Sequence, residues 1–382
     1  MMPQDLLPTN LYIGLMSGTS ADGIDLALVN FTADSHQLIA SFYQPYTDDT
    51  RDLITALYTP CNNEIDRMGY LDKLLSQQFA KAIKQFLSQQ SLLASDIKAI
   101  GNHGQTIRHR PVQQHAFTLQ IGCNQTLACL TGIKVIGKFR DKDIALGGQG
   151  APLVPAYHKE IFASKVTDVC VVNIGGISNI TFLPADNNKS ICGFDTGPGN
   201  ALLDDWYRSH HKNCTHGIDL DGQWATTGKV NEQLLSALLS DPYFSSPAPK
   251  STGREYFHLN WLHEQLLNTR LLDKSLKNAD IQATLLQLTC ISIADSIQKL
   301  SNKSSIILCG GGANNPLLVQ KLTEFLPTHN ISNAAAHGVE NDSLEALIFA
   351  WLAFAHENNI PGNLPEVTGA MYPTVLGNSY QP

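Results

Sequence analysis

Residues 13–29 read IGLMSGTSADGIDLALV, in which an apolar run meets a short polar turn and a second apolar run leaves it. This order predicts a β-hairpin. Its turn gathers backbone N–H groups, the hydroxyls of Thr19 and Ser20, and the carboxylates of Asp22 and Asp25. Glycine lets the backbone approach a ligand closely, and hydroxyl groups donate hydrogen bonds to phosphate oxygens. The hairpin is therefore either a phosphate-binding turn or an ordinary surface turn, for which the same residue types are common.

A phosphate group bound at this turn would require a cation beside it. The two aspartates would repel the phosphate unless a divalent cation lay between them, and carboxylate oxygens are ligands that Mg²⁺ prefers. The phosphate interpretation therefore predicts a Mg²⁺ ion near the turn. Its candidate ligands are Asp22 and Asp25, directly or through water.

The composition limits the classes of function. The chain has 382 residues, 43% of them hydrophobic, and a formal net charge of −8. This length allows two well-buried domains, and the negative charge without a long Lys/Arg run argues against a nucleic-acid or membrane surface. No signal peptide or membrane-spanning run is visible, and the eight cysteines are scattered without a C-x-x-C pair. We therefore expect a cytoplasmic protein with reduced thiols and a small polar ligand.

One order of elements occurs twice along the chain. It consists of an apolar hairpin, a later helix, a short strand and a glycine-containing loop. In the first half, we expect these elements at residues 13–29, 70–93, 97–100 and 101–106. In the second half, we expect them at residues 171–183, 280–300, 305–309 and 310–312. The residues of the two halves are not visibly alike, so only the element order repeats.

This repetition predicts an α/β protein with two similar lobes that face a cleft. The first lobe comprises residues 1–135, completed by the C-terminal segment 340–382, and the second lobe comprises residues 136–339. Glycine turns after strands, together with a Gly-Gly-Gly loop before a helix, fit a nucleotide held by backbone amides. The chain has no Walker P-loop and no G-x-G-x-x-G after a first strand, which disfavours the P-loop and dinucleotide-binding classes.

Phosphoryl transfer also needs a carboxylate that accepts a proton, and Asp195 is the best candidate. It lies in GFDTGPGN, residues 193–200, which predicts a tight turn before a helix that starts at Ala201. The positive end of that helix would keep the carboxylate ionised. Alternatively, Asp195 is only a turn or capping residue.

Further polar residues gather in the loops between these elements. His103 follows the strand at 97–100, and its nearest possible partner, His109, is not at the spacing of two metal ligands on one helix face. We expect His103 to bind a polar ligand or to stabilise its loop. Two other segments are denser in functional groups than plain connectors require, namely 137–155, with Arg140 and Asp143, and 250–257.

Seven motifs in one order resemble those of a known family. They are GLMSGTSADGID, GNHGQTIRH, FRDKDIALGGQGAPLVP, NIGGISNIT, GFDTGPGN, KSTGREYF and CGGGANN. Together they resemble the anhydro-N-acetylmuramic acid kinase family, a branch of the actin, hexokinase and Hsp70 superfamily, over residues 12–376. The resemblance implies a two-lobed actin-like/ribonuclease H-like ATPase fold with a central cleft.

The resemblance also implies an activity. The family uses ATP and Mg²⁺ to convert 1,6-anhydro-N-acetylmuramic acid to N-acetylmuramic acid 6-phosphate, in peptidoglycan recycling and amino sugar catabolism. Water opens the 1,6-anhydro bond while the sugar O6 receives the γ-phosphate. A cytoplasmic homodimer is expected. The alternatives are an ordinary sugar kinase, in which Asp195 deprotonates a hydroxyl, and a nucleotide-dependent binding protein without turnover.

The motifs carry the family's residue roles onto this sequence. The resemblance assigns to Asp195 the activation of the water that attacks C1. It assigns the ATP phosphate turn to Gly18, Thr19, Ser20, Ala21, Asp22, Gly23, Ile24 and Asp25. The glycine turn and loop of the second half add the expected nucleotide contacts Gly175, Gly176, Gly310, Gly311, Gly312 and Asn314. The resemblance assigns sugar contacts to His103, Gln105, Arg140, Asp143 and Glu345.

Overall fold

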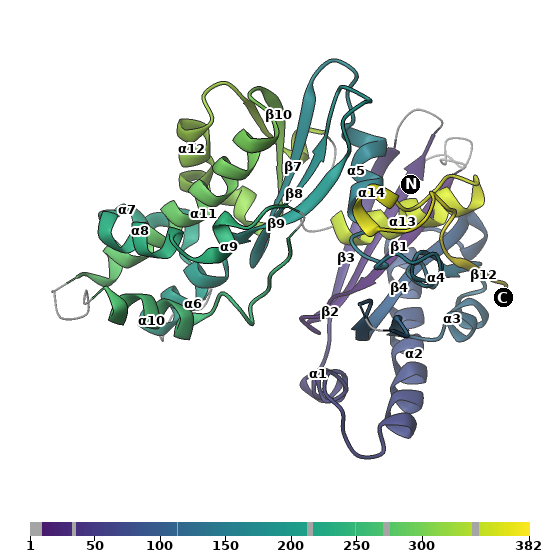
Figure 1. Cartoon of the computed structure of the whole chain (residues 1–382). Coiled ribbons are helices and arrows are strands. Elements are labelled where there is room, and N and C mark those ends of the chain that lie inside the picture. The colour runs from purple at the N-terminus through teal and green to yellow at the C-terminus, as the bar shows by residue number, and fades with distance from the viewer. Residues whose placement is uncertain are drawn as a thin grey trace. The chain divides into compact units, whose positions relative to one another are not determined.

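The computed structural model describes residues 10–32, 36–112, 114–211, 217–248, 250–269, 276–337 and 344–382. The chain divides into two compact units, each with its own sheet. The first unit comprises Met1–Ile161 with Gly338–Pro382, and the second comprises Phe162–His337. Figure 1 shows the elements of both units along the chain.

The first unit is built on a seven-stranded mixed sheet with the order β12-β6-β4-β1-β2-β3, and β5 pairs with β4. β1, β2 and β3 are antiparallel neighbours, whereas β4 runs parallel to β1 and β6 runs parallel to β4. The strands are β1 (Leu11–Ser17), β2 (Gly23–Phe31), β3 (His36–Pro45), β4 (Ile97–Arg110), β5 (Phe117–Ile121), β6 (Val135–Gly137) and β12 (Asn378–Tyr380). The predicted hairpin at residues 13–29 is confirmed as β1 and β2.

The α-helices of this unit are α1 (Asp48–Thr55), α2 (Glu64–Gln90), α3 (Asn124–Thr131), α4 (Asp141–Ala145), α5 (Val154–Phe162), α13 (Leu344–Glu357) and α14 (Pro365–Thr368). Of these, α2 and α13 cover opposite faces of the sheet. Side chains alternate between the faces of a strand. Ile13 and Leu15 of β1 therefore share a core with Phe79 and Ile83 of α2, while Gly14 faces α13. The helix predicted at residues 70–93 is confirmed as α2, which begins six residues earlier.

Two glycines let α13 lie directly on the strands. Gly14 of β1 and Gly101 of β4 are register partners. A Cβ atom at Gly14 would lie 1.7 Å from the carbonyl oxygen of Ala346, and one at Gly101 would lie 1.9 Å from that of Phe349. Gly101 is therefore required by helix packing and does not mark a turn. The polar loop predicted at residues 101–106 is wrong, because these residues continue β4.

The second unit is built on a five-stranded sheet with the order β11-β10-β7-β8-β9. β7, β8 and β9 are antiparallel neighbours, whereas β10 runs parallel to β7 and β11 runs parallel to β10. The strands are β7 (Asp168–Ile174), β8 (Ile177–Leu183), β9 (Cys192–Pro198), β10 (Ser304–Cys309) and β11 (Asn330–Asn333). β9 replaces the tight turn predicted at residues 193–200, because Cys192–Pro198 pairs with β8 along its whole length.

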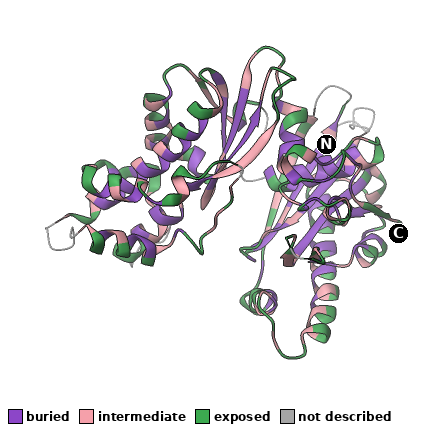
Figure 2. Ribbon diagram, in the orientation of Figure 1, coloured by how far each residue is buried: buried purple, intermediate pink, exposed green. Residues whose placement is uncertain are grey.

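The helices of the second unit bury a separate core against its sheet. They are α6 (Ala201–His210), α7 (Gln223–Thr226), α8 (Glu232–Leu239), α9 (Pro242–Ser245), α10 (Leu259–Asn268), α11 (Asn278–Leu300) and α12 (Pro316–Phe325). Figure 2 shows the buried residues along the strands and on the inner faces of the helices. The sequence predicts a helix at 280–300, confirmed as α11. Asn315 caps α12 by accepting hydrogen bonds from Leu317 and Leu318 N–H.

Both sheets follow one plan. Three antiparallel strands are followed by two parallel ones, as β3-β2-β1-β4-β6 in the first unit and as β9-β8-β7-β10-β11 in the second. This repeated plan confirms the predicted α/β class and the actin-like/ribonuclease H-like ATPase fold. Among the residues described, no helix combines the length and apolar character needed to cross a membrane.

The two units differ from the predicted lobes mainly in one segment. Residues 136–161 were assigned to the second lobe, but the contacts place them in the first unit. The reason is local pairing: β6 pairs with β4 and β12, and Asp143 accepts hydrogen bonds from Asn363 and Thr368 of the C-terminal segment.

Candidate active site

In the first unit, the backbone carbonyls of the β1–β2 turn accept hydrogen bonds from other residues of that unit. Gly18 C=O accepts hydrogen bonds from Gln105 Nε2 (3.0 Å) and Ala21 N–H (3.1 Å). Thr19 C=O accepts a hydrogen bond from the Tyr58 hydroxyl (2.8 Å). The side chain of Thr19 itself is exposed. The turn therefore directs its carbonyls into the unit and leaves the Thr19 side chain exposed, where its hydroxyl can donate a hydrogen bond to an anionic ligand.

The second half of the turn combines a strained residue with an exposed carboxylate. Ala21 has φ = 51° and is fully buried, so its methyl group anchors the turn in the core. Ser20 Oγ donates to Asp22 Oδ1 (2.8 Å), and Asp22 is exposed. Gly23 starts β2 where a Cβ atom would lie 2.5 Å from the Tyr43 ring, and Ile24 is buried beneath it.

Asp25 lies half-buried on β2, three residues beyond Asp22. The described part of the chain contains no cluster of three or more His, Cys, Asp or Glu side chains arranged to hold a metal ion. The predicted metal role of these two aspartates stays a prediction.

Gln105 supports this turn from β4. It is fully buried, its Oε1 accepts a hydrogen bond from Ser17 Oγ (2.5 Å), and its Nε2 donates to Gly18 C=O and to the Tyr58 hydroxyl. Ser17 Oγ also lies 2.8 Å from the Tyr46 hydroxyl. The carboxamide is thus engaged inside the protein, and its position supports a role in holding the turn.

His103 and Arg140 form a buried pair in the same unit. His103 Nδ1–H donates to Gly104 C=O (2.9 Å), and Nε2 accepts from Arg140 Nε (3.2 Å) and Nη2 (3.0 Å). Arg140 Nη1 also donates to Gly150 C=O (2.8 Å). Burial and the adjacent guanidinium hold the pKa of His103 well below its ordinary value, so the ring is neutral. Both ring nitrogens are engaged, and His103 orients Arg140.

Glu345 interacts electrostatically with both Arg140 and Asp22. Burial lowers the pKa of Arg140 to about 10, and the charge of Glu345 counteracts this effect. Burial raises the pKa of Glu345, while Arg140 lowers it and Asp22 raises it. Glu345 nevertheless remains accessible to solvent at the start of α13. The first unit therefore brings Asp22, Arg140 and Glu345 together at the carboxyl ends of its parallel strands, where ligands bind in α/β sheets.

Asp143 is fully buried and supports this group indirectly. Its Oδ2 accepts from Gly150 N–H (2.7 Å), and its Oδ1 accepts from Asn363 Nδ2 and Thr368 Oγ1 (both 2.7 Å). Gly150 is the residue whose carbonyl accepts from Arg140. These bonds occupy both carboxylate oxygens, so Asp143 fixes the loop that positions Arg140.

The β7–β8 turn of the second unit is tied to the start of α6. Gly175 C=O accepts from Asn200 N–H (2.8 Å), and Gly176 C=O accepts from Gly199 N–H (2.9 Å) and Ala201 N–H (3.0 Å). As in the first unit, the carbonyls of the turn accept hydrogen bonds from residues of the same unit.

The Gly310–Gly312 loop packs against the same hairpin. Gly310 has φ = 79°, and a Cβ atom there would lie 2.3 Å from Asn173 Oδ1. A Cβ atom at Gly312 would lie 2.3 Å from Ile174 Cγ2, whereas the nearest atom to one at Gly311 is 3.9 Å away. Gly311–Asn314 form a short 3-10 helix, and Asn314 is its last residue. The predicted nucleotide residues of this unit therefore lie together.

Asp195 lies on β9, where the segment after residue 249 runs beside it. Its N–H donates to Lys250 C=O (3.0 Å), and its Oδ2 accepts from Ser251 Oγ and Thr252 N–H (both 2.9 Å). Burial raises the pKa of Asp195, whereas the bonds from Thr252 and Ser251 lower it and the charge of Glu255 raises it. The predicted helix-dipole effect does not set this pKa, because Asp195 is on a strand six residues before α6.

Arg254 lies beside the β7–β8 turn. Its Cδ is 3.8 Å from the position of a Cβ atom at Gly176. Its Nη2 donates to Asp205 Oδ1 (2.9 Å), and more than half of the side chain is exposed. Asp205 also pairs with Arg208. An exposed guanidinium beside a glycine turn can meet an anionic ligand at that turn.

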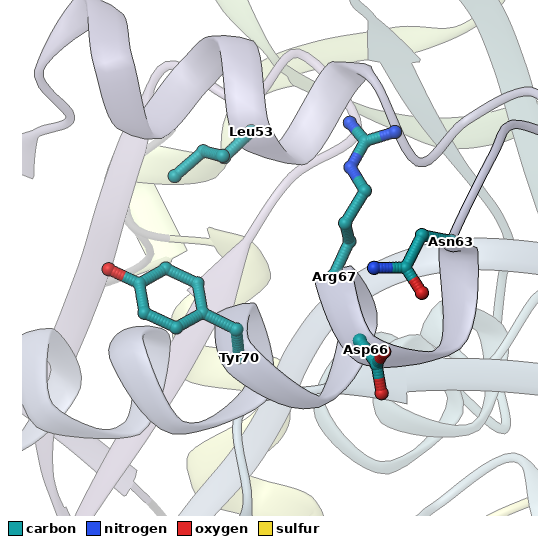
Figure 3. A pocket seen from close by; sticks show the side chains of 5 residues that line it. All are labelled: Leu53, Asn63, Asp66, Arg67 and Tyr70. Carbon is teal, nitrogen blue, oxygen red and sulfur yellow. The ribbon is translucent and has the colours of Figure 1, made fainter.

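Sequence reasoning missed Ser251, Thr252, Tyr58 and Ser17. The motif KSTGREYF drew attention to Arg254 and its neighbours, but the pairing of Ser251 with Asp195, 56 residues away, leaves no trace in a single sequence. A cavity of about 250 Å³ between α1 and α2 contains none of the predicted site residues (Figure 3). It is lined by Leu53, Asn63, Asp66, Arg67 and Tyr70.

Two units that repeat one sheet plan, each with a hairpin turn whose carbonyls accept hydrogen bonds from the same unit, have the plan of an actin-like ATPase fold. The family model for anhydro-N-acetylmuramic acid kinase matches residues 10–382. The chain therefore belongs to the anhydro-N-acetylmuramic acid kinase family, a family of ATP-using kinases, and the predictions of family and enzyme class are confirmed.

Curated relatives cover almost the whole chain. The anhydro-N-acetylmuramic acid kinase of Colwellia psychrerythraea is 54% identical, over 97% of this chain and 97% of its own. Those of Shewanella denitrificans and Saccharophagus degradans are 48% and 47% identical, over 97% and 98% of this chain and 98% and 99% of their own.

Proposed function

We propose that this chain uses ATP and Mg²⁺ to convert 1,6-anhydro-N-acetylmuramic acid to N-acetylmuramic acid 6-phosphate. The observation that carries the proposal is Asp195, whose Oδ2 is held by two donors while its Oδ1 accepts no hydrogen bond from the residues described. A carboxylate held in this way, in a family of anhydro sugar kinases, suits the activation of a nucleophile. The reaction belongs to peptidoglycan recycling and amino sugar catabolism in the bacterial cytoplasm.

Asp195 is the general base in this reaction. Its carboxylate takes a proton from water as the water oxygen forms a bond to C1 of the sugar. The C1–O6 bond breaks, and O6 forms a bond to the γ-phosphorus of ATP as ADP leaves. Burial raises the pKa of Asp195 and makes it a stronger base, while the hydrogen bonds from Thr252 and Ser251 lower this pKa and favour the ionised form.

The nucleotide contacts are assigned to the glycine turns of both units. In the first unit they lie in Gly18–Asp25, where inward carbonyls leave an outward surface suited to phosphate oxygens. In the second unit they lie at Gly175–Gly176 and Gly310–Asn314. The exposed carboxylate of Asp22 and the half-buried Asp25 offer the oxygen ligands that Mg²⁺ prefers, and the bound ion would neutralise charge on the transferring phosphate.

The candidate sugar residues fall into two groups, according to whether their side chains still have hydrogen-bonding groups available to a ligand. Arg140 keeps N–H donors beyond its bonds to His103 and Gly150, and Glu345 is accessible, so these two are assigned to the sugar. His103, Gln105 and Asp143 are assigned to positioning. A homodimer is also proposed, and light scattering in solution tests it.

The decisive experiment is the reaction in ¹⁸O-labelled water. The purified protein is incubated with ATP, Mg²⁺ and 1,6-anhydro-N-acetylmuramic acid, and the product is analysed by mass spectrometry. Label at C1 of a 6-phosphorylated sugar supports hydrolytic opening. Phosphorylated product without label would leave an ordinary sugar kinase. The absence of sugar-dependent ADP release would leave a nucleotide-binding protein without turnover.

A further inference from the structure

Asp195 and the segment Lys250–Thr252 are far apart in the sequence and lie side by side in the second unit. Asp195 N–H donates to Lys250 C=O at 3.0 Å, so the two backbones are paired. Directly beyond this bond, Ser251 Oγ and Thr252 N–H donate to the same carboxylate oxygen, Oδ2, each at 2.9 Å. One short segment thus fixes both the backbone and the side chain of Asp195.

The segment is itself anchored by Tyr243. The Tyr243 hydroxyl donates to Asp195 C=O (2.7 Å). Lys250 Nζ donates to Tyr243 C=O (2.8 Å) and lies 4.5 Å from the centre of the Tyr243 ring. Asp195, Lys250 and Tyr243 therefore form a closed ring of contacts, which limits the movement of the segment relative to β9.

We infer that Ser251, together with the backbone N–H of Thr252, is a positioning residue that holds Asp195 by Oδ2 so that Oδ1 is the oxygen that accepts the proton. This inference rests on the proposed function of Asp195 as the base. A carboxylate with two free oxygens can rotate about its χ2 bond, whereas two donors on one oxygen fix the plane of the group. The remaining oxygen then has one orientation toward the nucleophile.

The same donors tune the charge of the base. Hydrogen bonds to a carboxylate favour its ionised form. The charged and titratable groups that face Asp195 are Glu255, Lys250 and Tyr243, and of these Glu255 opposes ionisation. Loss of the Ser251 hydroxyl therefore removes one of two stabilising bonds and raises the pKa of Asp195.

The test compares the Ser251→Ala, Ser251→Thr and Ser251→Cys variants with the wild-type enzyme. Ser246→Ala is the matched control, because Ser246 is exposed in the same region and its hydroxyl donates only to Pro242 C=O (2.9 Å). The pH profile of kcat with ATP and the anhydro sugar is the first readout. The second is the ¹³C NMR titration of carboxyl-labelled aspartate, with the Asp195→Asn protein used to assign the Asp195 signal.

Ser251→Ala is expected to move both the acid limb of kcat and the Asp195 titration upward by about half a unit to one pH unit. It should also lower the plateau kcat by about tenfold with little change in KM. Ser251→Thr should restore both values, Ser251→Cys should fall between, and Ser246→Ala should match the wild type. If Ser251→Ala does not fold, Ser251→Cys provides the same comparison.

The results separate the two hypotheses. An unchanged acid limb and an unchanged Asp195 titration in Ser251→Ala, with an active wild-type enzyme, overturn the positioning role and leave the proposed function intact. An inactive wild-type protein overturns the proposed function. The NMR titration then still decides whether Ser251 stabilises the Asp195 carboxylate.

Discussion

A methyl group added at residue 101 tests how α13 is held against the first sheet. An ideal Cβ atom at Gly101 would lie 1.9 Å from the carbonyl oxygen of Phe349 and 2.6 Å from its carbonyl carbon. Both atoms belong to the backbone of α13, so no side-chain rotation relieves the clash. The helix would have to move by about 1.1 Å for the first contact to reach 3.0 Å, below which real Cβ atoms are essentially never found.

The expected cost follows from this rigidity. Adding one methyl group to a packed core costs about 1–3 kcal/mol where neighbouring side chains can adjust. The neighbour at Gly101 is a helix that is buried along most of its length, so the shift also disturbs its other contacts. We therefore expect Gly101→Ala to lower the free energy of unfolding by about 3 kcal/mol.

Gly69→Ala is the matched control for the same chemical change. Gly69 lies in α2, is exposed, and has no atom within 4 Å of an added Cβ. Alanine in a helix interior is more stable than glycine by roughly 0.5–1 kcal/mol, so this variant should be stabilised. Urea unfolding followed by circular dichroism measures both. A Gly101→Ala protein within about 0.5 kcal/mol of the wild type would refute the close packing of α13 on β4.

Three further predictions concern the site residues. Asp195→Asn should bind ATP and the sugar but lose turnover, and near-normal kcat in the variant would contradict the base role. Because burial raises the pKa of Asp195, the wild-type kcat should fall as the pH is lowered through a value above the ordinary aspartate pKa of about 4. A flat wild-type profile in that range would contradict this. Arg254→Ala should lower kcat by about a hundredfold, because the guanidinium lies beside the Gly176 turn, and Arg254→Lys should recover part of the loss. If Arg254→Ala and the wild type have equal kcat values in steady-state assays, Arg254 does not belong to the site. Asp143→Asn should lower the free energy of unfolding by about 2 kcal/mol, because the new amide N–H₂ would face a hydrogen-bond donor where a carboxylate oxygen now accepts. An unchanged urea midpoint would show that the hydrogen bonds to Asp143 contribute little to stability.

The sequence predicted the hairpins and the long helices well, because their signals are local. Apolar runs around a glycine turn specify β1–β2 and β7–β8, and helical periodicity specifies α2 and α11. Its errors in placing turns came from glycine, which occurs both in turns and where another element packs closely on the backbone, and a single sequence cannot separate these two causes. Gly101 is required by a helix 248 residues further along the chain, not by a turn. The glycines of 193–200 likewise lie in or beside β9, where Gly197 has φ = 148° and a Cβ atom at Gly199 would lie 2.4 Å from Gly175 C=O.

The motif residues found from the sequence gather within their own units, but their individual roles depend on contacts. A glutamine, a histidine and an aspartate in polar motifs suit a sugar ligand by residue type. In the structure, the Gln105 carboxamide is hydrogen-bonded to the β1–β2 turn and the His103 ring to Arg140. The Asp143 carboxylate is hydrogen-bonded to Gly150 and to the C-terminal segment. A buried polar group must satisfy its hydrogen bonds within the protein or with its ligand, and residue type does not say which.

The same reasoning explains why the positioning residues were harder to find than the groups they position. Asp195 stands out in a sequence because a carboxylate is a reactive group, whereas Ser251 looks like any loop serine. Its significance comes entirely from a 2.9 Å bond to a residue 56 positions away. If that bond orients the base, the substitution that removes it must change the pH profile without unfolding the protein, because Ser251 is exposed and contributes little to the core. A role in stability alone would instead change the unfolding midpoint and leave the ionisation of Asp195 where it was.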